Sequence, residues 1–141
     1  MGIIIPSKFA VSLSTDVPCG ALSSAVAKAA TIEPPFFQRK FKYRKAIGIG
    51  TGSLTEVDSS IAIDEHGYAS LPDKVFELRL YSLLLRIVIS ALTDGSEARF
   101  MCINDPKVGY VWARALADRT GEFLKESGAS RLEVEVLKAR G

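Results

Sequence analysis

The run from Leu71 to Leu92 constrains the fold most, because it is the most apolar stretch of the chain. Three charged residues interrupt its part from 75 to 92: Glu77, Arg79 and Arg86. Ser70 precedes the run, and Asp73 follows three residues later, which is a capping-box pattern. The run therefore predicts a helix over 71–92. A helix this apolar belongs at the centre of a protein or against a second copy of the chain.

The same run permits two other interpretations. Its segment FELRLY, residues 76–81, alternates polar and apolar side chains as a strand does, but the length of the run and its cap favour the helix. A membrane span is disfavoured, because three charged side chains would lie within the lipid.

Periodicity elsewhere predicts an α+β fold with one compact domain over 1–141 and a mixed sheet. Segment 1–35 could instead form a loosely packed N-terminal arm. If the last two strands are parallel neighbours, their connection is right-handed. The expected elements are helices over 21–30 and 106–127, strands over 3–13, 99–103 and 131–136, and an antiparallel hairpin over about 38–64 with its returning strand at 60–64.

The charge of the chain is nearly balanced overall but uneven along its length. The formal net charge is +2, with seven Lys/Arg against four Asp/Glu in residues 1–58 and 11 against 12 in residues 59–141. A local excess of this kind predicts one basic binding stripe and disfavours a basic coat over the whole surface.

Two cysteines, Cys19 and Cys102, lie far apart without the spacing of a metal site. No secretory signal with a charged start precedes them. We therefore expect free thiols and a cytoplasmic location, or the interior of a virion if the protein is viral.

The basic excess is concentrated in the segment QRKFKYRKAIGIGT, residues 38–51. Five of the seven residues 39–45 are basic, and aromatic residues alternate with them. In an extended strand one face would carry Arg39, Phe41, Tyr43 and Lys45, and the other would carry Lys40, Lys42 and Arg44. Cations beside aromatic rings suit phosphates and stacked bases, so the segment predicts binding of RNA or another polyanion. The alternative is an edge strand that its charges protect from aggregation.

A glycine-spaced loop follows the basic segment. Its backbone could approach a phosphate closely, with two hydroxyls as further donors. It matches neither the dinucleotide-binding nor the P-loop pattern, and a hairpin turn explains it equally well. The candidate residues are Gly48, Gly50, Thr51, Gly52 and Ser53.

His66 is the single histidine, within the sequence Asp64-Glu65-His66-Gly67. Beside carboxylates it could act as a general base, with the glycine loop holding an anionic substrate. That combination would make the protein a small enzyme acting on a phosphorylated metabolite. A polar turn is the simpler interpretation of these four residues. No catalytic residue, metal ligand or cofactor is therefore predicted, and an enzyme is disfavoured.

Two short motifs lie near the N-terminus. Pro34-Pro35-Phe36-Phe37 resembles the PPxY peptides with which viral matrix proteins recruit budding machinery, with Phe37 in place of the tyrosine. Met1-Gly2 begins like a myristoylation signal, with Pro6 where serine or threonine is required. The resemblance implies a matrix-like structural subunit that binds membrane and RNA.

The leading hypothesis is a non-enzymatic interaction protein. It would form homo-oligomers through the helix 71–92 and bind RNA, or an acidic protein, through residues 39–45. A viral matrix-like or other assembly subunit and a small enzyme are the alternatives.

Overall fold

A single antiparallel sheet organises the residues that the computed structural model describes, which are 10–31, 54–80 and 83–137. Its six strands are β1 (Ala10–Thr15), β2 (Leu54–Val57), β3 (Lys74–Leu80), β4 (Leu83–Leu92), β5 (Gly95–Cys102) and β6 (Leu132–Leu137). The helices are α1 (Cys19–Thr31), α3 (Ser60–His66) and α4 (Pro106–Glu126). The predicted α+β class is confirmed.

The strands lie in the order β2-β3-β4-β5-β1-β6, and every neighbouring pair is antiparallel. The predicted mixed sheet is therefore wrong. β1 lies between β5 and β6 and pairs with both, so the last two strands are not neighbours. Residues 10–31 thus supply an inner strand and a helix of the core.

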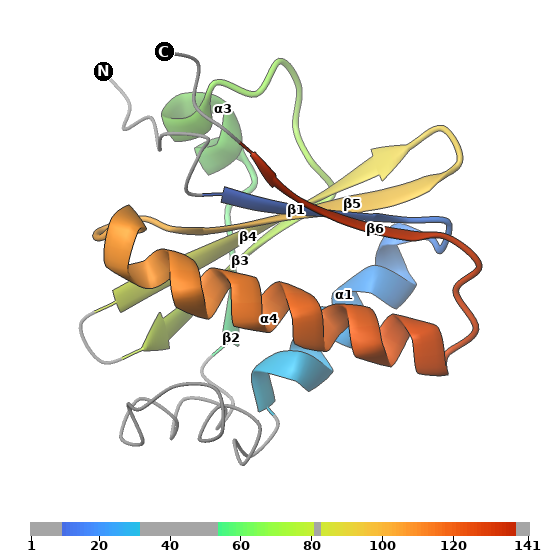
Figure 1. Cartoon of the computed structure of the whole chain (residues 1–141). Helices are drawn as coiled ribbons and strands as arrows, with labels where there is room; N and C mark the ends of the chain where they lie inside the picture. The colour runs from blue at the N-terminus through green and yellow to red at the C-terminus, as the bar shows by residue number, and fades with distance from the viewer. Residues whose placement is uncertain (1–9, 32–53, 81–82, 138–141) are drawn as a thin grey trace.

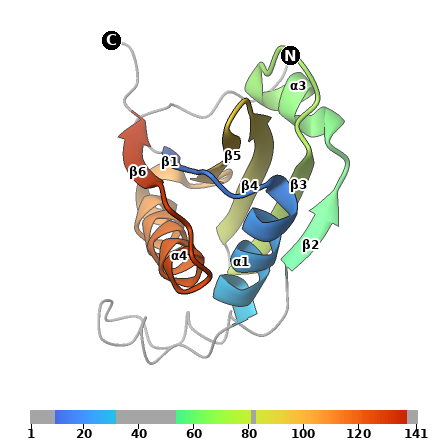
Figure 2. The same cartoon turned by 90° about the vertical axis from the view of Figure 1, so that its right-hand side faces the viewer.

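Helices cover the two faces of the sheet unequally. Figures 1 and 2 show α1 and α4 together on one side of the sheet, with α3 away from them. Alternation along β4 explains the layers: Leu85, Ile87 and Ile89 pack in the large core with α1 and α4. Val88 points the other way, into a smaller cluster with Ala62 of α3.

Small residues bring α4 close to the sheet. Ala113 and Ala117 are fully buried beside Trp112 and Leu116. Near the start of the helix, a Cβ on Gly109 would overlap the Cβ and Sγ of Cys102 in β5. Glycine there is consequently a packing requirement of the helix–sheet interface.

Both ends of α4 follow from the local sequence, and the helix predicted over 106–127 is confirmed. Pro106 opens it, where a missing N–H costs no hydrogen bond. At the other end Gly128 has a φ of 95°, a conformation in which glycine is unstrained. The Ala129 N–H then donates to the Leu124 carbonyl at 3.0 Å and closes the helix.

The helix predicted over 71–92 is wrong. The segment forms the antiparallel pair β3 and β4, and β4 pairs with β5 on its other side. Apolar residues occupy both faces of β4 because both faces are covered: Ile87 and Val88 point to opposite faces, and both are buried. On a helix, the same residues would lie all around the circumference. Burial within one chain accounts for most of this apolar run, although Leu71 and Leu92 at its two ends are exposed.

The returning strand predicted at 60–64 is also wrong, because these residues begin α3. Residues 38–53 of the predicted hairpin lie outside the described residues. Within the described part, β2 pairs with β3 instead. The predicted helix at 21–30 and the strands near 99–103 and 131–136 are confirmed as α1, β5 and β6.

Candidate functional site

Both segments that the sequence singled out for binding, 39–45 and 48–53, lie outside the described residues. The connection that contains them leaves α1 at Thr31 and returns at Leu54 of β2. Figures 1 and 2 show the C-terminal end of α1 and the start of β2 at the same end of the molecule.

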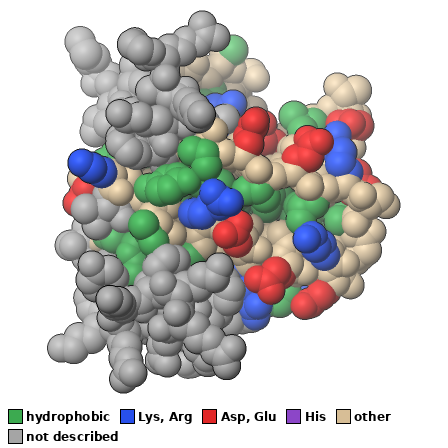
Figure 3. Space-filling model, in the orientation of Figure 1, with side chains coloured by type: hydrophobic (Ala, Val, Ile, Leu, Met, Phe, Trp, Pro, Cys, Tyr) green, Lys and Arg blue, Asp and Glu red, His purple; other side chains and the backbone are tan. Residues whose placement is uncertain are grey.

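The described residues have the opposite charge balance to that connection. They contain ten Lys/Arg and 15 Asp/Glu, a net charge of −5, whereas the whole chain has +2. Six of the ten cations are in ion pairs: Lys74, Arg86, Arg99, Arg114, Arg119 and Arg131. Basic and acidic side chains are mixed on the face shown in Figure 3. The described part of that face therefore offers no basic patch to a polyanion.

The most buried ionic cluster centres on Arg86 of β4, whose side chain is 5% exposed. Its Nε and Nη2 both donate to Oε2 of Glu77 on β3, at 3.1 and 2.6 Å. Its Nη1 donates to Glu65 Oε1 at 3.0 Å and lies 2.9 Å from His66 Nε2. Side chains from two strands and a helix thus meet at one guanidinium. We call these four residues the Arg86 cluster.

The donor chemistry fixes the state of His66. A guanidinium can only donate, so His66 Nε2 must accept, and the ring is neutral with its proton on Nδ1. Burial lowers the pKa of His66 below its usual value, and the charge of Arg86 lowers it further, while Glu65 opposes them. With its Nε2 lone pair engaged, His66 is poorly arranged to take a proton from a substrate.

Asp64, one of the two carboxylates that precede His66, is exposed on α3. Its neighbour Glu65 contributes to the Arg86 cluster instead. The glycine loop lies outside the described residues, so its position relative to His66 and Asp64 is not described. The enzyme hypothesis therefore gains no support.

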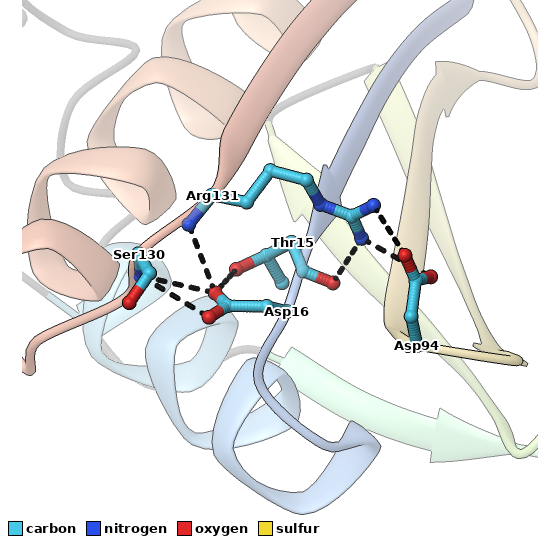
Figure 4. Close-up of polar contacts among 5 residues, drawn as sticks. All are labelled: Thr15, Asp16, Asp94, Ser130 and Arg131. Atoms are coloured by element: carbon cyan, nitrogen blue, oxygen red, sulfur yellow. Dashed lines mark hydrogen bonds and ion pairs between the residues drawn. The ribbon is translucent and has the colours of Figure 1, made fainter.

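A second polar network joins three distant parts of the chain (Figure 4). Asp16, just after β1, accepts backbone hydrogen bonds from Ser130 and Arg131, both at 3.1 Å to Oδ1. The Arg131 side chain reaches Asp94 at 2.8 Å and the Thr15 carbonyl at 2.9 Å. The Arg131 backbone N–H is the main cause of a lowered pKa at Asp16. This network connects the start of β6 to two turns.

Within the described ranges, no group of three or more His, Cys, Asp or Glu side chains is arranged to hold a metal ion. No helix among them is long and apolar enough to span a membrane. No family model, curated protein or solved structure matches the chain.

Sequence reasoning missed the Arg86 cluster. The sequence placed Arg86 in the predicted helix 71–92, whereas it is buried on β4 opposite Glu77 of the neighbouring strand. The available signal was the alternation of FELRLY, because antiparallel strands in the observed register place these opposite charges side by side. The link to α3 is not visible in the sequence, since nothing local pairs residues 65 and 66 with residue 86.

Proposed function

We propose that this protein binds single-stranded RNA, or a polyanion like it, through residues 39–45 and catalyses no reaction. The partition of charge supports the proposal: five cations lie within seven residues, while the described fold has a net charge of −5. An acidic frame repels nucleic acid, so binding would depend on this one segment.

The aromatic residues make the proposal specific for a ligand with bases. Phe41 and Tyr43 alternate with the cations and could stack on bases, while the cations contact phosphates. A polyanion without bases, such as heparin, would engage only the cations.

The main test is a titration of labelled single-stranded RNA by fluorescence anisotropy at several salt concentrations. The variant with Arg39→Glu, Lys40→Glu and Lys42→Glu should lose most of the affinity. Its slope of log affinity against log salt should fall by about 2, since each lost phosphate contact on a single strand contributes about 0.7.

A matched control changes the same charge elsewhere. Lys28, Lys107 and Lys125 are exposed on α1 and α4, and their replacement by glutamate should weaken binding much less. Equal losses in both triple variants, or no binding by the native protein at low salt, would refute the proposal.

A second pair of changes separates RNA from other polyanions. Phe41→Ala with Tyr43→Ala should cost about 1–3 kcal/mol per stacked base with RNA. The same variant should bind heparin as the native protein does. Loss of both ligands would point to a folding defect, which circular dichroism would detect.

A further inference from the structure

A small apolar cluster holds α3 on the sheet. The helix has seven residues, and Ala62 is its one fully buried residue. Ala62 and the partly buried Ile61 pack on the second face of the sheet, in a cluster with Val75, Val88 and Met101. A helix this short is not stable by itself, so its position depends on these contacts and on the polar contacts at its C-terminal end.

Among the described residues, the polar contacts that join this end of α3 to the sheet use the Arg86 guanidinium. Four hydrogen bonds connect it to its partners, two to Glu77, one to Glu65 and one to His66. Both bonds to α3 come from Nη1. Of the three acceptors, histidine is the residue type that takes up a proton nearest to neutral pH, and its protonated nitrogen can no longer accept.

We propose that α3 is a pH-sensitive switch: proton uptake at Nε2 of His66 breaks its hydrogen bond from Arg86 and releases α3 from the sheet. The charged groups that face the ring are Arg86 from β4, Glu65 from α3 and Glu77 of β3 through Arg86. Protonation would place two cations in contact and leave an N–H of a buried guanidinium without its acceptor.

Release would uncover an apolar strip of the sheet, made by Val75, Val88 and Met101. The switch is closed at neutral pH, because burial and Arg86 keep the pKa of His66 below its usual 6.5. It involves none of residues 39–45, so its failure would leave the proposed RNA binding unaffected.

The single histidine makes the first test direct, because one ring signal reports the switch in the native protein. Its chemical shift should titrate with a midpoint below about 6.5. Backbone signals of Ile61 and Ala62 should change along the same curve. A ring that titrates without any change at Ala62 would overturn the proposal.

Hydrogen exchange measured by mass spectrometry provides the second test. After correction for intrinsic rates, exchange across 60–66 should accelerate by up to about tenfold per pH unit below 6.5. In His66→Gln the amide oxygen can still accept from Arg86 but cannot titrate, so this acceleration should disappear. Glu65 and Glu77 are present in both proteins, and their contribution cancels.

A permanent cation extends the comparison. His66→Lys should exchange rapidly across 60–66 at pH 7.5 as well as at pH 5.5. Equal pH dependence in the native protein and His66→Gln would contradict the switch. If His66→Gln does not fold, the titration of the native protein decides the question alone.

Discussion

The charged side chain of Arg86 is almost completely buried, whereas its three partners are all partly exposed. Its side chain is 5% exposed, against 22% for Glu77 and 30% for Glu65. The exposed pair Lys74–Glu56 lies on the neighbouring edge of the same sheet, with 3.9 Å between Nζ and Oε1. These two pairs allow buried and exposed ion pairs to be compared within one sheet.

Replacing Arg86 by methionine should lower the free energy of unfolding by about 2–4 kcal/mol, since two carboxylates lose their shared donor inside a packed cluster. Lys74→Met should lower it by less than about 1 kcal/mol, because water already screens that pair. Urea denaturation measures both values. Similar losses in the two variants would show that the Arg86 cluster contributes no more than a surface pair.

Close packing against Cys102 requires glycine at position 109. In Gly109→Ala the new methyl group would overlap Cys102, so the helix must move away from β5. We expect the free energy of unfolding to fall by about 1–3 kcal/mol, as it does when other cores are overpacked. Urea unfolding measures this change.

Gly20 provides the matched control for that substitution. It also lies in a helix, but nothing lies within 4 Å of a Cβ built on it. Gly20→Ala should be neutral or stabilise the protein by up to about 1 kcal/mol, because alanine loses less entropy on folding. A loss equal to that of Gly109→Ala would contradict the packing explanation.

At the scale of elements, the Asp16 network connects the turn after β1 to the start of β6 (Figure 4). Its backbone hydrogen bonds lower the pKa of Asp16 from the usual 3.8. A carboxylate with a lowered pKa stabilises the fold above its unfolded pKa, and this contribution disappears as the pH falls through the folded value.

Asp16→Asn should therefore be less stable than the native protein at pH 7. The difference should shrink as the pH falls below about 3.8. Chemical denaturation between pH 7 and pH 3 measures it. Asp118→Asn removes the same charge from an exposed pair on α4 and should show little of this effect. A constant difference at every pH would exclude the ionised carboxylate as its source.

Elements with a local signal could be predicted from the sequence. Helix α4 has an opening proline, a closing glycine and an apolar stripe, and strands β5 and β6 alternate clearly. The pair β3 and β4 was missed because its pattern satisfies two periods at once. Pairing of β4 with β5 favours strands over a helix in this segment, and neither composition nor capping encodes that contact.

The Arg86 cluster was missed for the same reason. It requires the register between Glu77 and Arg86 and the position of α3 across the sheet. His66 attracted attention as a possible base, whereas its contact with Arg86 gives it another role. The basic segment 39–45 was visible from composition alone, and its function remains a prediction.

At the scale of the whole molecule, β6 is an outer strand of the described sheet, and its solvent-facing side chains are acidic. β6 presents Glu133 and Glu135 to solvent. If two copies paired along β6 about a two-fold axis at Val134, each glutamate would lie opposite a glutamate of the other copy. Like charges on an outer strand oppose such association.

Replacing both Glu133 and Glu135 by glutamine should therefore increase self-association, measured by sedimentation velocity at several protein concentrations. Glu122→Gln with Glu126→Gln removes the same net charge from the exposed side of α4 and is the control. An equal increase in both proteins would indicate a general effect of net charge. No increase in either would show that these glutamates do not protect the strand.

The position of β1 between β5 and β6 also has a consequence for biosynthesis. A ribosome makes β1 before both of its partner strands, of which the first ends at Cys102 and the second at Leu137. Most of the described chain must therefore emerge before β1 can complete its pairing. Until β5 and β6 have been made, both edges of β1 lack these partners, and unpaired strand edges are prone to pair with other strands.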